Sequence, residues 1–119
     1  MDLDLEYRQG ILFARPRGEL DLSVADRFRE ILEENLAKNS VNHLVFNLSR
    51  VSFIDSSGLG VILGRYKKLA QQGGRVSLVG MRPPVRRVLV LSGLLTVMPE
   101  YVSEEEAVAR AGRGGNQDG

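Results

Sequence analysis

The sequence predicts a single α/β domain, built from a mixed sheet of four or five strands flanked by about four helices. Short apolar runs rich in strand-forming residues alternate with longer segments whose apolar residues recur at helical spacing. The 119 residues suffice for one domain with one hydrophobic core. We place this domain at residues 1–111. Residues 112–119, GRGGNQDG, offer little to bury, and we expect them to form a disordered tail.

The first half of the chain predicts a hairpin, a helix and a strand. Residues 3–7 alternate apolar and polar side chains, and a turn at 8–10 leads into a second strand at 11–17. We expect Ser23 to cap the helix that follows. The apolar run at 44–48 predicts a central strand. The inward face of the first helix is predicted to consist of Val24, Phe28, Ile31, Leu32 and Leu36.

The second half continues the alternation of helices and strands. A long helix is predicted to begin near Ser57 and to end at Gly73-Gly74, before a strand at 76–79. A third helix begins at Pro83-Pro84, and residues 95–98 suggest a last short strand. Ser103 and Glu106 have the spacing of a capping box for a final helix. The predicted inward stripe of the long helix is Leu59, Ile62, Leu63, Tyr66, Leu69 and Ala70.

Composition excludes several classes of function. The net charge is +1 with Lys and Arg spread along the chain, which argues against a nucleic-acid binder. The absence of cysteine excludes disulfides and thiolate metal sites. The sequence has no signal-like start and no apolar run near the length of a membrane span. We therefore expect a cytoplasmic protein that contacts no membrane.

The stretch FIDSSGLGVILGRYKKL at residues 53–69 places glycines where a helix is predicted, although each costs about 1 kcal/mol there relative to alanine. On a helical wheel at about 100° per residue, Gly60, Val61 and Gly64 fall mostly on the outward side. A flat outward strip with an apolar neighbour predicts a docking surface for another protein. The alternative is that these glycines let a loop of the same chain pack closely.

Two adjacent hydroxyls, Ser56 and Ser57, precede this strip and follow Asp55. A helix start presents unpaired N–H groups and a positive dipole end, so it accommodates a phosphoryl group well. A phosphate there would add about −1.5 to −2 charges at the edge of the docking strip. The sequence thus suggests a phosphorylation switch, and the alternative reading of a simple helix cap remains open.

The sequence does not match the motifs of dinucleotide-binding proteins, P-loop proteins or serine hydrolases in detail. The glycines of GLGVILG follow the spacing GxGxxxG, which differs from the dinucleotide fingerprint, and no Walker lysine follows a glycine-rich loop. DSSG is not the GxSxG of a serine hydrolase. His43, the single histidine, is distant in sequence from the serines and indicates a solvated or structural residue. We therefore expect a protein that is not an enzyme, with no catalytic residue, cofactor or metal site.

Four segments together resemble the bacterial anti-sigma factor antagonists, which are STAS-domain proteins: GELD at 18–21, residues 53–69, QQGG at 71–74 and PPVRRVLVLSGL at 83–94. The resemblance extends to about Ala109, and GRYK is similar to the sporulation type. It implies that the unphosphorylated protein binds an anti-sigma factor that is also a serine kinase, which frees the sigma factor. The kinase, with its ATP or ADP and magnesium, phosphorylates the antagonist, which then dissociates, and a serine phosphatase restores it.

The resemblance also assigns roles to residues of this chain. Ser56 matches the phosphorylated serine, and Asp21 matches an aspartate that helps the kinase to recognise its substrate. Val90 departs from the family, in which an acidic residue is frequent. Two alternatives are a stress-response antagonist and a STAS module that senses a nucleotide or small ligand. We expect a monomer when the protein is free. The full set of expected partner-binding residues is Asp21, Asp55, Ser57, Gly58, Gly60, Val61 and Gly64.

Overall fold

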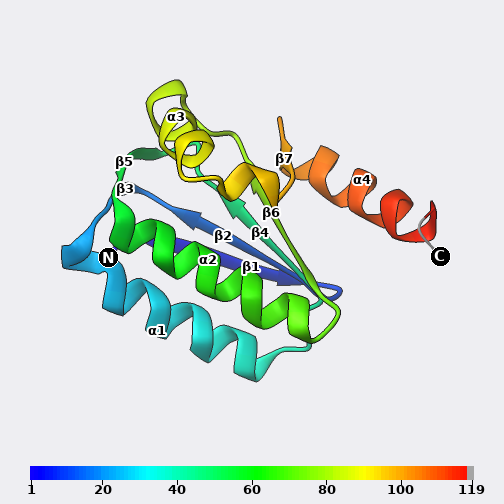
Figure 1. Ribbon diagram of the computed structural model, residues 1–119. Helices are drawn as coiled ribbons and strands as arrows, with labels where there is room; N and C mark the ends of the chain where they lie inside the picture. Colours follow the sequence, from blue (N-terminus) through cyan, green and yellow to red (C-terminus); the bar gives the residue numbers. More distant parts are fainter. Residues whose placement is uncertain (118–119) are drawn as a thin grey trace.

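A mixed five-stranded sheet forms the centre of the computed structural model, which describes the backbone of residues 1–117 and the side chains of residues 1–111 (Figure 1). The strand order is β1-β2-β4-β6-β7, with β1 and β2 antiparallel and the other neighbours parallel. A separate two-stranded sheet pairs β3 with β5 in parallel. The predicted α/β fold with a mixed sheet is confirmed.

Four α-helices accompany the two sheets in the described residues. The strands are β1 (Leu3–Arg8), β2 (Ile11–Pro16), β3 (Gly18–Leu20), β4 (His43–Asn47), β5 (Val51–Ile54), β6 (Arg75–Val79) and β7 (Glu100–Tyr101). The helices are α1 (Leu22–Lys38), α2 (Ser56–Gln71), α3 (Pro83–Leu91) and α4 (Glu104–Gln117), with a short 3-10 turn η1 (Leu94–Thr96).

The predicted opening hairpin is confirmed, but its turn has two residues, because Arg8 still belongs to β1. Gln9 and Gly10 join β1 to β2 with φ angles of 49° and 84°. Both angles lie in the left-handed region, which the favoured two-residue hairpin turn requires at its two central positions. The local sequence therefore fixes the register of the hairpin, in which Arg8 faces Ile11.

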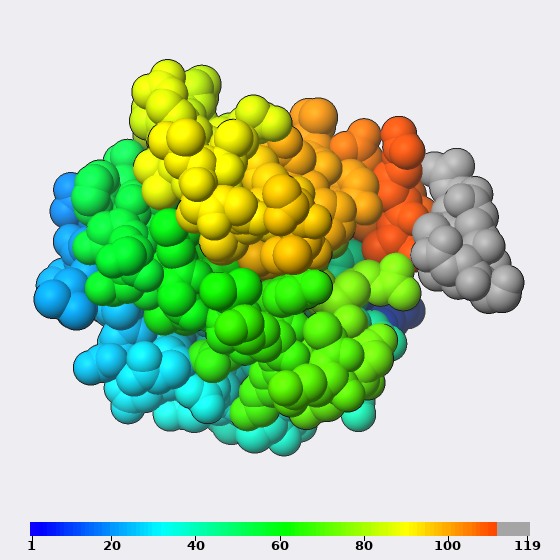
Figure 2. Space-filling model, in the orientation of Figure 1, coloured from blue at the N-terminus to red at the C-terminus, as the bar shows by residue number. Residues whose placement is uncertain are grey.

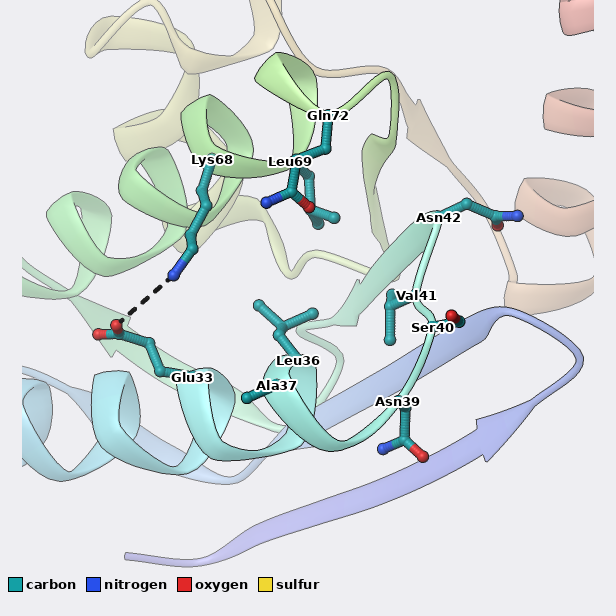
Figure 3. A pocket seen from close by; sticks show the side chains of 10 residues that line it. All are labelled: Glu33, Leu36, Ala37, Asn39, Ser40, Val41, Asn42, Lys68, Leu69 and Gln72. Atoms are coloured by element: carbon teal, nitrogen blue, oxygen red, sulfur yellow. Dashed lines mark ion pairs between the residues drawn. The ribbon is translucent and has the colours of Figure 1, made fainter.

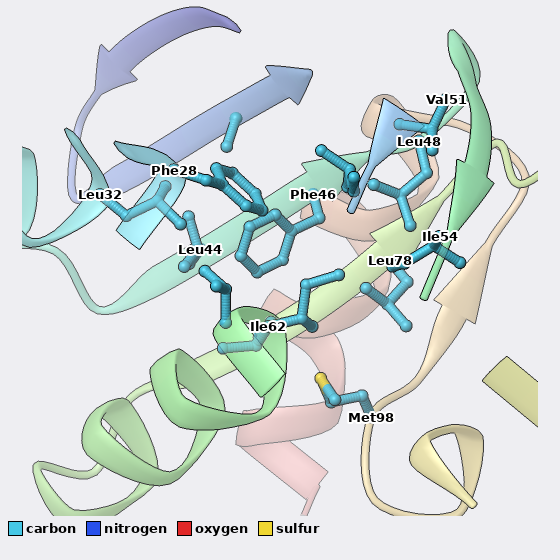
Figure 4. Close-up of a cluster of buried hydrophobic side chains, with 14 of the residues drawn as sticks. Phe28, Leu32, Leu44, Phe46, Leu48, Val51, Ile54, Ile62, Leu78 and Met98 are labelled. Carbon is cyan, nitrogen blue, oxygen red and sulfur yellow. The ribbon is translucent and has the colours of Figure 1, made fainter. Parts of the chain in front are cut away.

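The strand residues alternate between two hydrophobic clusters on the two faces of the main sheet. Leu44, Phe46 and Leu78 belong to the larger cluster, which lies under α1, α2 and α3. Figure 4 shows Phe28 of α1 beside Phe46, with their ring centroids 6.1 Å apart, and Ile62 of α2 nearby. The smaller cluster, on the other face, is Phe13, Val45, Val79 and Ala107, and the last of these belongs to α4.

An ion pair attaches the beginning of α4 to the sheet. Arg15 of β2 donates from Nε to Glu104 at 2.7 Å, and the side-chain amide of Asn47 donates to the same carboxylate at 2.9 Å. The hydrogen bond from Arg15 is the main cause that holds the pKa of Glu104 below its usual value. Ser103 Oγ accepts from the Glu106 N–H at 3.1 Å, so the predicted Ser103 cap of α4 is present.

The small β3–β5 sheet was not predicted. No strand was predicted between the second strand and the first helix, but Gly18–Leu20 pairs with Val51–Ile54. The sequence gives little signal because β3 is three residues long and its partner lies some thirty positions away. The predicted cap of α1 is also wrong: Asp21, not Ser23, is the N-cap residue, because its carboxylate accepts the Ser23 N–H.

The predicted strand at 95–98 is wrong as well. This segment forms a helical turn in which the Met98 N–H bonds to the Leu94 carbonyl at 3.0 Å, and both side chains are buried. Residues four apart share one face in a strand as well as on a helical turn, so the apolar spacing alone did not distinguish the two conformations. The last strand begins at Glu100 instead.

The expected tail only partly overlaps the described residues. The backbone of α4 is helical to Gln117, whereas residues 112–119 were expected to be disordered. Side chains beyond Ala111 and all of residues 118–119 lie outside the described residues. The domain boundary at residue 111 therefore stays a prediction.

His43 is a structural residue inside the sheet. It is 4% exposed, and its Nε2 lies 2.7 Å from Ser77 Oγ on β6. Burial, and to a lesser extent the charge of Arg75 in the opposite register position, lowers the pKa of His43 to about 4. The folded protein thus holds a neutral imidazole at pH values where the unfolded chain is protonated.

We predict that the stability decreases as the pH falls from about 6.5 to about 4. In this window the unfolded state binds a proton at His43 and the folded state does not. The neutral His43 therefore makes its full contribution to the free energy of unfolding above about pH 6.5. The loss amounts to about 3 kcal/mol. Urea denaturation at a series of pH values measures it. His43→Gln should flatten the slope in this window, and an unchanged slope in the variant would contradict the assignment.

Candidate phosphorylation and docking site

Two helix N-termini, those of α1 and α2, begin side by side at the carboxyl ends of β3 and β5. Asp21 caps α1 and Asp55 caps α2. The Asp55 carboxylate accepts the N–H groups of Ser57 at 2.9 Å and Gly58 at 3.2 Å through Oδ1. Its other oxygen accepts the Leu22 N–H of α1 at 3.3 Å. One carboxylate therefore connects the beginnings of both helices.

The two serines occupy different environments at this point. Ser56 is the first residue of α2 and is exposed, whereas Ser57 is half-buried. The alternative that one of the two serines is a simple helix cap is wrong, because Asp55 has this role. Ser56 follows the cap directly, so it lies at the positive end of the helix dipole. Its hydroxyl is not needed to cap the N–H groups at the start of α2, because Asp55 accepts them.

Gly58 is required by close packing within the chain. A Cβ on this residue would lie 2.3 Å from the Leu20 carbonyl oxygen and 3.0 Å from Ile54 Cγ1. The same Leu20 carbonyl accepts the Asp55 N–H at 3.3 Å. For Gly58, the alternative reading of the glycines as a means of close internal packing is therefore correct.

Gly60 and Gly64 differ from Gly58. Among the residues that the structure describes, no heavy atom lies within 4 Å of a Cβ built on either glycine. Gly60 is exposed and Gly64 is half-buried. Ser56, Gly60 and Gly64 follow one another at intervals of four along α2, so a strip without side chains leads away from Ser56.

Val61 is not part of this strip. It is 4% exposed, and the prediction that it lies outward beside the glycines is wrong. Helix α1 lies alongside α2 and covers this side: Arg65, one turn further on, is also buried, with Nη1 3.5 Å from a Glu33 oxygen of α1. The predicted inward face of α2 was displaced around the helix axis because Arg65, which is buried, was not counted among the inward residues.

Exposed apolar side chains adjoin the site, and sequence reasoning missed them. Leu22, whose N–H bonds to Asp55, is 77% exposed, and Phe53 of β5 is 49% exposed. Val90 and Leu91 are exposed on α3, which packs against β5. Figure 2 shows the green surface of α2 between α1 (blue to cyan) and α3 (yellow). Alternation would not have indicated Phe53, because β5 buries Val51 and Ile54 at its ends and exposes both residues between them.

The described residues include no group of three or more His, Cys, Asp or Glu side chains placed to hold a metal ion. None of the helices in this part of the chain is long and apolar enough to cross a membrane. Asp21 and Asp55 supply negative charge, and the helix N-termini supply partial positive charge. This arrangement can present a hydroxyl to another protein's active site.

The chain belongs to the STAS domain family. The family model of the STAS domain matches residues 2–107, which include all the elements from β1 to the first turn of α4. This match confirms the expected domain type.

Within this family, the chain is homologous to anti-sigma factor antagonists. An anti-sigma F factor antagonist of Paenibacillus polymyxa is 41% identical over 108 residues, 91% of this chain and 92% of that protein. The structure of SpoIIAA in its unphosphorylated form has a TM-score of 0.81 at 35% identity, covering 94% of this chain and 96% of that one. Phosphorylated SpoIIAA of Bacillus has a TM-score of 0.72 at 34% identity, covering 92% and 98%.

We predict opposite effects for alanine at two glycines of α2. Gly58→Ala should lower the free energy of unfolding by about 1–3 kcal/mol, because the methyl group overlaps the Leu20 carbonyl. Gly64→Ala should raise it by up to about 1 kcal/mol, because this position is open and alanine favours the helix. Chemical denaturation measures both. Equal effects of the two substitutions would contradict the packing assigned to Gly58.

Proposed function

We propose that this protein is an anti-sigma factor antagonist of the sporulation type that is switched by phosphorylation of Ser56. The unphosphorylated form binds an anti-sigma factor that is also a serine kinase, so that the sigma factor is released. The observation that carries the proposal is the exposed Ser56 at the first position of α2, beside the open strip at Gly60 and Gly64. The homology to anti-sigma factor antagonists supports it.

In this proposal the protein is a substrate and a ligand, and it performs no chemistry of its own. The Ser56 oxygen attacks the γ-phosphorus of ATP bound with magnesium to the kinase. The bond from this phosphorus to the bridging oxygen breaks, ADP leaves, and the hydroxyl proton passes to a base of the kinase. The missing side chains at Gly60 and Gly64 leave room for the kinase to approach along α2. A serine phosphatase reverses the modification.

Charge separates the two proteins after the transfer. The phosphate adds about −1.5 to −2 charges beside the carboxylates of Asp21 and Asp55. The helix N-terminus accommodates this charge, so the fold itself persists. The resemblance of this chain to SpoIIAA in both the unphosphorylated and the phosphorylated form is consistent with a switch that needs little change of fold. Repulsion at the partner therefore drives release.

Asp21, Asp55, Ser57, Gly58, Gly60 and Gly64 are the residues that we propose to form or support the docking surface. The exposed side chains of Leu22 and Phe53 extend it. We propose that the protein acts in the cytoplasm and is a monomer when free.

We predict that incubation with the cognate anti-sigma kinase and ATP adds one phosphate, and that Ser56→Ala abolishes this gain. Ser57→Ala is the matched control and should still gain one phosphate, because Ser57 supports the site through its backbone N–H to Asp55, which alanine retains. Intact-protein mass spectrometry measures the added mass. Phosphorylation of the Ser56→Ala protein at the normal rate would place the site elsewhere.

We also predict that Ser56→Asp weakens binding to the kinase by about tenfold or more, through negative charge at the docking surface. Ser56→Asn has nearly the same size without the charge and should bind much as the unmodified protein does. Isothermal titration calorimetry compares the two variants. An equal loss of affinity in both would show that bulk rather than charge releases the partner.

A further inference from the structure

A groove of about 540 Å³ lies between the last turns of α1 and α2 (Figure 3). This volume lies within the range of about 300–1,000 Å³ that is typical of sites for small organic molecules. Lys68, Leu69 and Gln72 line it from α2. Ser56 begins the same helix, roughly 20 Å away at about 1.5 Å per residue. The groove is therefore separate from the candidate phosphorylation site.

At one end of the groove a single carboxylate, that of Glu33, lies near several cations, of which only Lys68 lines the groove. Glu33 of α1 lies 3.9 Å from Lys68 Nζ, a pair marked in Figure 3, and 3.5 Å from Arg65 Nη1. Both distances exceed the roughly 2.7–2.9 Å of a charge-assisted hydrogen bond. Arg29 also approaches Glu33, at 3.8 Å, but it has a closer partner in Asp26 at 2.8 Å. Glu33 is thus shared between Arg65 and Lys68 and binds neither tightly.

Arg65 is the less satisfied of these two cations. It is 8% exposed, and its Nε and Nη1 atoms are buried without a hydrogen-bond partner among the described residues. A buried guanidinium that lacks acceptors is unfavourable, since it has lost its bonds to bulk water. Arg65 lies three and four residues before Lys68 and Leu69, which places it on the same side of α2 as the groove.

The rest of the groove combines apolar and polar surfaces. Leu36 points from α1 toward α2, and with Leu69 it supplies an apolar floor (Figure 3). Asn42 and Gln72 belong to the other end of the groove, where α1 and α2 finish. Helix C-termini carry partial negative charge, which disfavours an anionic group beside Asn42 and Gln72, whereas the Lys68 ammonium offsets this charge at the other end of the groove.

We propose that this groove binds a small organic anion, in which a carboxylate or phosphate group is attached to a compact apolar body. The anionic group bonds to Lys68, and the body lies on Leu36 and Leu69. Glu33, no longer shared with Lys68, turns toward Arg65 and supplies the acceptor that the buried guanidinium nitrogens lack. Binding thus completes the pairing of both cations. This site does not depend on the phosphorylation of Ser56.

Nuclear magnetic resonance titration of the full chain tests the proposal. The probes are hexanoate and phenyl phosphate, and hexan-1-ol and benzyl alcohol serve as their neutral counterparts. We expect saturable shifts of the Leu69 and Gln72 amides with at least one anionic probe. Lys68→Gln should weaken that binding at least about fivefold. Lys67→Gln is the matched control, because Lys67 is exposed on the same turn and does not line the groove.

The outcomes distinguish the source of the anion. Binding of hexanoate alone supports a carboxylate ligand, binding of phenyl phosphate alone supports a phosphate ester, and binding of both supports the shared anionic chemistry. The proposal is overturned if neither anion gives saturable shifts, if the alcohols bind as tightly, or if Lys68→Gln binds as the unmodified protein does. A loss that is equal in Lys67→Gln and Lys68→Gln would also overturn it, since it would reflect net charge alone.

Discussion

The Asp55 carboxylate holds together the part of the molecule on which its proposed activity depends. It caps α2 through the amides of Ser57 and Gly58 and also accepts the Leu22 amide at the start of α1. Amides at a helix start have no partner within the helix, so a carboxylate that satisfies amides of two helices also fixes their relative position. Because Asp55 takes the capping role, Ser56 is left exposed and available at the positive end of α2.

The backbone around Asp55 is held equally closely. The Leu20 carbonyl at the end of β3 accepts the Asp55 amide and lies against Gly58. No residue with a side chain fits at this point, since even a Cβ would lie 2.3 Å from the oxygen. The glycines of α2 thus have two separate explanations. Gly58 lets the helix pack on its own chain, whereas Gly60 and Gly64 leave its outer surface open.

Helix α2 connects two regions of different chemistry. Its beginning has the Asp55 cap, an exposed hydroxyl and nearby exposed apolar side chains, and it lies beside the Asp21 cap of α1. Its end contributes Lys68 to a groove in which Glu33 is shared between Lys68 and the buried Arg65, which lies between the two regions. The packing of α1 along α2 produces both features, because it aligns the two N-termini at one end and Glu33 with Arg65 at the other.

The sequence by itself determined the hairpin, the alternation of strands and helices, the start of α3 and the Ser103 cap, because each depends on residues close together in the chain. It also identified the STAS family, since the motif at residues 53–69 is contiguous. The caps Asp21 and Asp55 accept amides two or three positions further along the chain, so they are local features that the sequence analysis missed. Tertiary structure alone decided the pairing of β3 with β5, the burial of Val61 and the hydrogen bond from the Leu22 N–H to Asp55. Each of these results depends on residues brought together from distant positions. The inward face of α2 includes a buried arginine, which lies opposite a glutamate of another helix. The spacing of apolar residues within α2 cannot reveal this neighbour.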